Sequence, residues 1–92
     1  MEIQYDKEKS KSNKAKHGVD FEEVKQIWNN PYVEFSARSN YENRYAAIGY
    51  INKKLYTCIF CLRGDSARII SCRRAREGEV KLYEKELGKT EK

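Results

Sequence analysis

The chain has 92 residues, of which 36% are charged and 12% are aromatic, and its formal net charge is +5 at pH 7. This length suits one small domain, so we assign residues 1–92 to a single domain with a mobile tail at 89–92. The excess of lysine and arginine favours a polyanionic partner, either a nucleic acid or an acidic protein. We recognise neither a signal peptide nor an apolar run of roughly 20 residues, and therefore expect a cytoplasmic protein without membrane contact.

The three cysteines are an odd number, which fits reduced thiols better than a disulfide framework. Cys58 and Cys61 form a Cys-x-x-Cys pair, but they lie within the apolar run 55–62, which has the character of a β-strand. Residues three apart on a strand point to opposite faces, so this pair cannot share a metal ion without leaving the strand. We therefore predict buried structural thiols, no bound metal and no cofactor.

The first expected elements are a short edge strand at 1–5 and a very polar helix at 7–16. Asp6 is a good N-cap residue for this helix, and Gly18 is a suitable terminator. The helix lacks an apolar stripe, so we expect it to depend on its intrinsic propensity and on contacts with neighbouring elements.

A second helix follows directly, because Asp20 and Glu23 have the spacing of a capping box. Asn30 and Pro31 end this helix. Apolar residues recur between these limits at helical spacing and predict one buried face. These residues are Phe21, Val24, Ile27 and Trp28.

From residue 32 the hydrophobic period changes to two, which predicts β-strands. The run 55–62 is apolar at almost every position, which indicates a central strand covered on both faces. Short turns between the later strands predict an antiparallel meander. We expect strands at 32–35, 44–51, 55–62 and from 68 onward, with a polar loop at 36–43.

The stretch 68–76 combines the end of the meander with a group of cations. Simple alternation places Arg68, Ile70, Cys72 and Arg74 on one face, and Ile69, Ser71 and Arg73 on the other. Three arginines fall within four residues just before a last helix at 76–87, and guanidinium groups pair bidentately with phosphate oxygens. This arrangement favours phosphate binding, with a basic solvated turn as the alternative. The three arginines are Arg73, Arg74 and Arg76.

Together the elements predict an α+β fold, in which an antiparallel sheet meander packs against two N-terminal helices and a C-terminal helix. Four segments also stand in a distinctive order and spacing. They are Asn13-x-x-Lys16-His17-Gly18-Val19 with Phe21-Glu22-Glu23, then Asn30-Pro31, then Arg44-Tyr45-x-x-Ile48-Gly49, and last Arg63-Gly64-Asp65 with Arg68-Ile69-Ile70-Ser71-Cys72-Arg73-Arg74-Ala75, Glu79 and Tyr83. Over residues 5–84 they resemble the BrnT family of bacterial type II toxins.

The resemblance implies a RelE-like fold and an endoribonuclease that cuts messenger RNA, free or on the ribosome, and so blocks translation. It also implies a cognate antitoxin, a small BrnA-like ribbon-helix-helix protein that binds DNA. Such an antitoxin masks the toxin, and operator DNA is then contacted only through the antitoxin in the complex.

Metal-independent RNA cleavage needs a general base for the 2′-hydroxyl, cations for the phosphate and an acid for the leaving 5′-oxygen. His17 is the only histidine, and histidine is the side chain that exchanges protons near neutral pH. These roles require the end of the first helix, the Arg68 strand and the last helix to meet on one side of the sheet. The catalytic candidates are His17, Arg68, Arg73 and Tyr83. The RNA-binding candidates are Lys16, Arg44, Arg63, Arg74 and Arg76.

Each candidate also has a structural alternative. His17 could cap the carbonyl groups of its helix, Arg68 could form a structural ion pair, and Tyr83 could belong to the core. Arg44 could pair with a carboxylate such as Glu22 or Glu23, and the remaining cations could be solvated. For the whole protein, the alternatives are a basic sheet that binds RNA without cutting it, and a former toxin that acts only as an antitoxin-binding corepressor.

Overall fold

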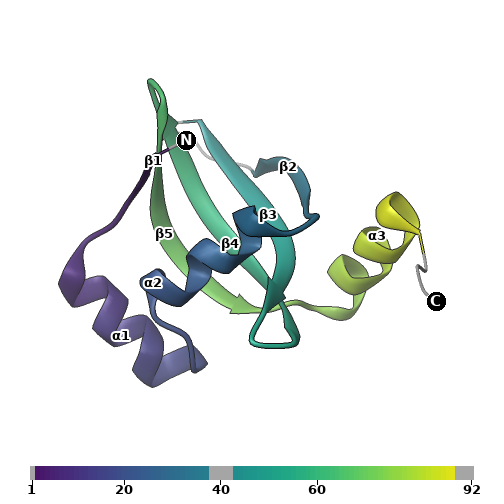
Figure 1. The fold of residues 1–92 in the computed structure, drawn as a ribbon, viewed down its shortest axis with the longest axis horizontal. Helices are drawn as coiled ribbons and strands as arrows, with labels where there is room; N and C mark the ends of the chain where they lie inside the picture. The colour runs from purple at the N-terminus through teal and green to yellow at the C-terminus, as the bar shows by residue number, and fades with distance from the viewer. Residues whose placement is uncertain (1, 38–42, 89–92) are drawn as a thin grey trace.

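A computed structural model describes residues 2–37 and 43–88 of the protein. The predicted α+β fold is confirmed: three helices and a 3₁₀ segment accompany one five-stranded sheet (Figure 1). Residues 38–42 of the expected polar loop and the expected tail at 89–92 lie outside the described residues. The elements are β1 (Glu2–Gln4), α1 (Lys7–His17), α2 (Phe21–Val24), η1 (Lys25–Asn29), β2 (Val33–Ala37), β3 (Arg44–Ile51), β4 (Lys54–Arg63), β5 (Ser66–Arg74) and α3 (Glu77–Leu87).

The sheet has the strand order β1-β5-β4-β3-β2. The four strands β2 to β5 form the predicted antiparallel meander, and β4 is its central strand. β1 pairs with β5 in parallel, so the sheet as a whole is mixed. Because β1 has only 3 residues, it covers only the first part of the outer edge of β5.

The ends of α1 follow from its capping residues. The Asp6 carboxylate accepts hydrogen bonds from the backbone N–H groups of Glu8 (2.8 Å) and Lys9 (3.1 Å). Gly18 adopts a left-handed conformation with φ of 87°, which a residue without a side chain reaches at little cost. Both predicted limits of this helix are confirmed to within one residue.

The second helix is shorter than its apolar pattern predicts. The Asp20–Glu23 capping box is present, but the α-helical turn ends at Val24 and continues as the 3₁₀ segment η1. 3₁₀ turns are common at helix ends, and here the chain is also stopped by Pro31 shortly afterwards. Ile27 of η1 is nevertheless fully buried, as predicted.

A β-bulge in β5 makes the expected simple alternation wrong. Ile59 pairs with Ser71 and Phe60 pairs with Ile69, so Ile70 is an extra residue in β5. As a result, Ile69 and Cys72 both enter the core, although they were expected on opposite faces.

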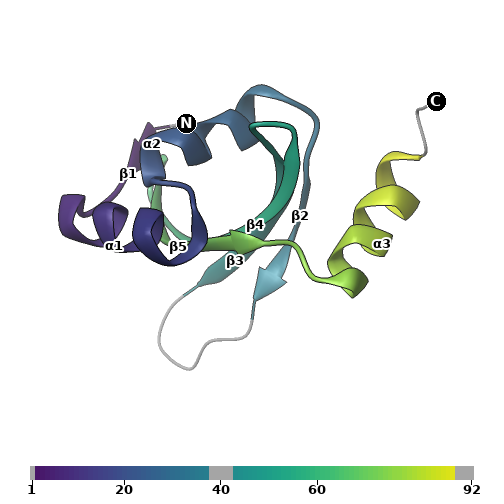
Figure 2. The same cartoon turned by 90° about the horizontal axis from the view of Figure 1, so that it is seen from below.

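The core lies between the sheet and the N-terminal helices, which cover the same face (Figure 1). Figure 2 shows the sheet curving around η1, while α3 stands apart from the other helices. α3 contains no buried residue and packs on β2 and β3. The buried cluster consists of Val19, Phe21, Val24, Ile27, Ala47, Ile51, Tyr56, Cys58, Phe60, Ala67, Ile69 and Cys72.

Candidate functional site

Three of the candidate arginines lie at one end of the sheet face that points away from α1 and α2. Arg44 pairs with Cys61, and Cys61 pairs with Arg68, so these side chains form one row across three strands. Arg63 lies two residues beyond Cys61 on the same face. Arg44 and Arg63 each also take part in an interaction within the chain. The register thus brings together cations that are far apart in the sequence.

Arg68 is also close to the start of α1. Hydrogen bonds from the backbone N–H groups of Lys9 and Glu8 lower the pKa of Asp6, and the positive charge of Arg68 lowers it further. Arg68 therefore lies near the N-terminal end of α1, whereas His17 is the last residue of that helix.

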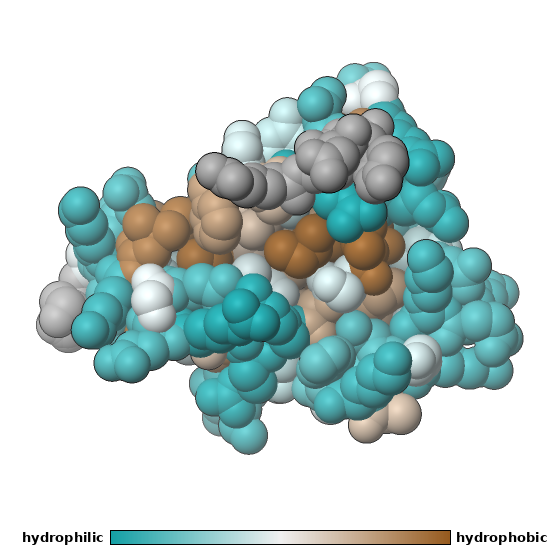
Figure 3. Space-filling model, turned by 180° about the vertical axis from the view of Figure 1, so that it is seen from behind, coloured by the Kyte–Doolittle hydropathy of each residue, from teal (hydrophilic) through white to brown (hydrophobic). Residues whose placement is uncertain are grey.

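The next row on this face is mostly apolar. Ser71 pairs with Ile59, Ile59 pairs with Ala46, and Ala46 pairs with Phe35. Seen from the side opposite to α1 and α2, apolar residues gather in the middle of the surface and hydrophilic ones surround them (Figure 3). A face of this kind can contact bases and ribose in its middle and phosphate groups at its rim.

A pocket of about 190 Å³ lies between α1 and β5. It contains two of the candidates, Lys16 and His17, and Ser71 places it at the edge of the arginine-bearing face. Sequence reasoning did not name Lys9, Ser12 or Ser71 as candidates. The lining residues are Lys9, Ser12, Asn13, Lys16, His17, Phe21, Ile70 and Ser71.

Asn13 fixes α1 against the part of β5 that β1 leaves uncovered. Its Nδ2 donates to the carbonyls of Val19 (2.8 Å) and Cys72 (2.9 Å), and its Oδ1 accepts from the Cys72 N–H (3.1 Å). The side-chain amide thus takes the place of a neighbouring strand at Cys72. One feature of the sequence indicates such a contact. The helix at 7–16 has no apolar stripe, so a polar contact must hold it against the sheet.

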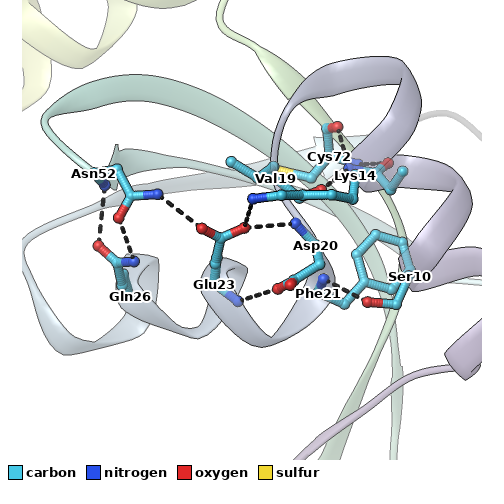
Figure 4. Close-up of polar contacts among 10 residues, drawn as sticks. Ser10, Lys14, Val19, Asp20, Phe21, Glu23, Gln26, Asn52 and Cys72 are labelled. Atoms are coloured by element: carbon cyan, nitrogen blue, oxygen red, sulfur yellow. Dashed lines mark hydrogen bonds and ion pairs between the residues drawn. The ribbon is translucent and has the colours of Figure 1, made fainter.

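A second network fixes the end of α1 against α2 and the β3–β4 turn (Figure 4). Glu23 Oε1 accepts from Lys14 Nζ (2.9 Å) and from the Asp20 N–H (2.9 Å). Asn52 Nδ2 donates to Glu23 Oε2 (3.0 Å), Asn52 Oδ1 accepts from Gln26 Nε2 (3.0 Å), and the Asn52 backbone N–H donates to Gln26 Oε1 (3.0 Å). These contacts lower the pKa of Glu23, chiefly through the Asp20 N–H and then through Lys14. His17 is therefore carried on a well-anchored helix.

Arg74 reaches the same end of α1 from the helix-covered side of the sheet. Its guanidinium lies 5.7 Å from the centre of the Tyr56 ring, in a cation–π contact. The Tyr56 hydroxyl lies next to Gly18, at 3.9 Å from the position that a Cβ atom on Gly18 would take. Tyr56 thus connects Arg74 with the residue that follows His17, a contact that sequence reasoning missed.

Arg73 is engaged in a bidentate ion pair. Its two terminal nitrogens each lie 2.8 Å from an oxygen of Glu79. Glu79 also accepts from the Thr57 hydroxyl (2.9 Å) and the Arg76 N–H (2.8 Å), and these contacts, led by Arg73, lower its pKa to about 2. Arg73 and the backbone of Arg76 therefore hold the start of α3 on the sheet.

The structure does not bring Tyr83 to His17 or Arg68, although Tyr83 lies one helical turn after Glu79, which binds Arg73. Tyr83 packs edge-on against Tyr50 with ring centres 5.6 Å apart, and its hydroxyl makes a long hydrogen bond of 3.4 Å to the Pro31 carbonyl. Burial and the neighbouring Tyr50 raise the pKa of Tyr83. α3 packs on β2 and β3, whereas His17 lies beside β5 on the other side of β4.

The cysteines are free and buried, as predicted. Cys58 and Cys72 face each other across β4 and β5 in the core. Within residues 2–37 and 43–88, no three His, Cys, Asp or Glu side chains lie close enough together to hold a metal ion. In the same part of the chain, none of the helices has the length and apolar character needed to cross a membrane.

Three helices and a five-stranded, largely antiparallel sheet in the described residues are consistent with a RelE-like fold. A family model for BrnT, the ribonuclease toxin of a type II toxin–antitoxin system, matches residues 5–79. The match covers most of the chain, which therefore belongs to the BrnT family of ribonuclease toxins. Membership of a type II system means that the protein has a cognate antitoxin. Comparison with curated proteins gave no significant match.

Proposed function

We propose that this toxin cleaves messenger RNA without a metal ion, at the end of α1 and along the arginine-bearing face of the sheet. The observation that carries the proposal is the pocket that holds Lys16 and His17 beside Ser71 of β5. Ser71 belongs to the same face as Arg68. A proton-transfer group and phosphate-binding cations are thus available at one edge of the sheet.

The reaction that suits these groups is transfer of the phosphate to the neighbouring 2′-oxygen. His17 removes the 2′-hydroxyl proton as the oxygen attacks phosphorus, and the bond to the 5′-oxygen breaks. Lys16 stabilises the charge that grows on the phosphate oxygens, while Arg68, near the other end of α1, binds a neighbouring phosphate of the same strand. The leaving 5′-oxygen takes up a proton from water, so the products are a 2′,3′-cyclic phosphate and a 5′-hydroxyl end.

The remaining candidates contribute binding and positioning in this proposal. Arg44, Arg63, Arg74 and Arg76 attract RNA phosphates around the site, which makes binding sensitive to salt. Arg73 acts through Glu79 to position α3, and Tyr83 braces α3 against Tyr50.

We also propose that the cognate antitoxin is a BrnA-like ribbon-helix-helix protein, and that both proteins act in the cytoplasm. Its binding would cover the arginine-bearing face, and operator DNA would be contacted only by the antitoxin. The positive net charge and the open apolar centre of that face support a partner with an acidic, amphipathic surface.

The test is cleavage of messenger RNA by purified protein in the presence of a metal chelator, for wild type, His17→Ala and Arg68→Ala. Lys11→Ala is the control, because Lys11 is an exposed cation of the same helix outside the pocket. We expect 2′,3′-cyclic phosphate ends from the wild type and the control, and a loss of roughly 10²-fold or more in rate for His17→Ala.

Three results would contradict the proposal. Full activity of folded His17→Ala would show that the pocket takes no part in the reaction. Salt-sensitive RNA binding by the wild type without any cleavage would identify a non-catalytic binding module, and antitoxin binding without RNA binding would identify a corepressor.

A further inference from the structure

One face of α1 is a continuous polar stripe that lines the pocket. Lys9, Ser12, Lys16 and His17 are spaced by three, four and one residues, so they project from one side of the helix. Asn13 lies on the same side and is bound to Cys72 of β5. The stripe must therefore face β5, whose Ser71 closes the pocket from the opposite wall.

The lining of this pocket fits an anionic sugar derivative. Lysine nitrogens and serine hydroxyls can donate hydrogen bonds to phosphate oxygens and ribose hydroxyls, and the described residues that line the pocket include no carboxylate. Phe21 and Ile70 provide an apolar floor. The Asp6 carboxylate near the helix start is occupied by the N–H groups of Glu8 and Lys9.

The two ends of the stripe are too far apart to bind a single phosphate. Lys9 and His17 are eight residues apart, which corresponds to about 12 Å along an α-helix. If the reacting phosphate lies at Lys16 and His17, a group bound at Lys9 belongs to a different nucleotide of the same strand.

We propose that Lys9, Ser12 and Ser71 form a second RNA subsite, which holds the phosphate and ribose of a nucleotide next to the cleaved bond or one step further. The inference rests on the proposed function, because it takes the end of α1 as the reacting site. The subsite makes the enzyme favour longer RNA strands, since a dinucleotide cannot occupy both ends of the stripe.

The experiment compares wild type with the double variant Lys9→Ala/Ser12→Ala, and Lys11→Ala serves as the matched control. Binding of a fluorescent hexanucleotide with 2′-fluoro sugars, which lack the attacking hydroxyl but keep an electronegative acceptor at each 2′ position, is measured at several salt concentrations. We expect the double variant to bind about tenfold more weakly, and its salt slope to fall by about 0.7 because one phosphate contact is lost. In cleavage assays, the advantage of a hexanucleotide over a dinucleotide should shrink through a higher KM.

The outcomes separate the two proposals. An unchanged affinity and salt slope in the double variant, with RNA cleavage by the wild type intact, would overturn the subsite alone. Binding losses in the double variant support the subsite even if the protein proves unable to cleave, because the probe cannot be cut. Failure of the wild type to bind the hexanucleotide would overturn both.

Discussion

At the scale of single residues, Asn13 makes the contact on which the position of α1 depends. Its side chain is almost completely buried and forms three hydrogen bonds, two of them to Cys72. Asn13→Ala would leave the Cys72 N–H and C=O without their partner at a buried strand edge. Unsatisfied groups of this kind cost about 1–3 kcal/mol each, so we expect the free energy of unfolding to fall by roughly 2–4 kcal/mol. Urea unfolding measures this loss.

Two further variants make the test of Asn13 specific. Asn13→Asp keeps the size but can no longer donate to the two carbonyls, so it should also be strongly destabilised. Lys11→Ala removes an exposed side chain of the same helix and should change stability by less than about 0.5 kcal/mol. An unfolding midpoint for Asn13→Ala equal to that of Lys11→Ala would show that the strand edge is satisfied in another way.

Replacement of glycine by alanine is expected to change the stability of the protein in opposite directions at two positions. A Cβ on Gly49 would lie 3.0 Å from Ile27 Cγ2 and 3.3 Å from Tyr32 Cβ, because η1 packs directly on β3 at this point. Gly49→Ala should therefore destabilise the protein by about 1–3 kcal/mol through overpacking. Gly78, in the first turn of α3, has open space around it, and Gly78→Ala should stabilise by up to about 1 kcal/mol. Thermal unfolding of both variants tests the pair, and a stable Gly49→Ala would mean that η1 moves easily.

At the scale of elements, α3 is attached through one carboxylate rather than through a buried face. Glu79 holds Arg73, Thr57 and the Arg76 N–H, and its pKa of about 2 lies below its ordinary value of 4.5. The depressed pKa means that this stabilisation is complete above about pH 4.5 and is lost as the pH falls towards 2. Because the pair is partly exposed, we expect a contribution on the order of 1–2 kcal/mol.

Glu79→Gln tests this attachment. The variant should be less stable at neutral pH, and its stability should depend less on pH between 4.5 and 2 than that of the wild type. Hydrogen exchange should also become faster in the backbone of α3, with Glu84→Gln, an exposed residue of the same helix, as the control. Unchanged exchange in α3 would indicate that Tyr83 and its neighbours hold the helix without Glu79.

Local sequence signals predicted the limits of an element well where a single residue determines them. Asp6 and Gly18 set the limits of α1, and β3 has the predicted bounds. The bulge at Ile70 was not predictable, because an inserted residue leaves the apolar pattern of a strand unchanged and only the pairing with β4 reveals it. The change to 3₁₀ geometry in η1 likewise depends on packing against β3, which no local pattern records.

The candidate site could be predicted only in part, for a related reason. Lys16 and His17 are neighbours in the sequence, and the structure places them in one pocket. Lys9 and Ser12 belong to the same pocket but look like solvated residues of a polar helix, because their proximity to Ser71 depends on the Asn13 contact. The separation of Tyr83 from His17 follows from strand order, which chain order does not give.

At the scale of the whole molecule, the three thiols report on how the sheet opens. Cys58, Cys61 and Cys72 are 0%, 2% and 0% exposed and lie on the two neighbouring strands β4 and β5. Burial raises the pKa of the Cys58 thiol, with a further contribution from the adjacent Cys72, so little of it is present as reactive thiolate. Reagents should therefore reach the thiols only when the central strands separate.

We expect labelling by a disulfide reagent in native buffer to be at least ~10³-fold slower than that of a free thiol, which reflects the population of the open state in a stable domain. Because the three sites share one pair of strands, mass spectrometry should show molecules with either no label or three labels under conditions in which labelling outpaces closing. A population labelled once, at Cys61, would contradict this cooperative opening. It would show instead that the arginine-bearing face, to which Cys61 points, opens locally while the core that contains Cys58 and Cys72 stays closed.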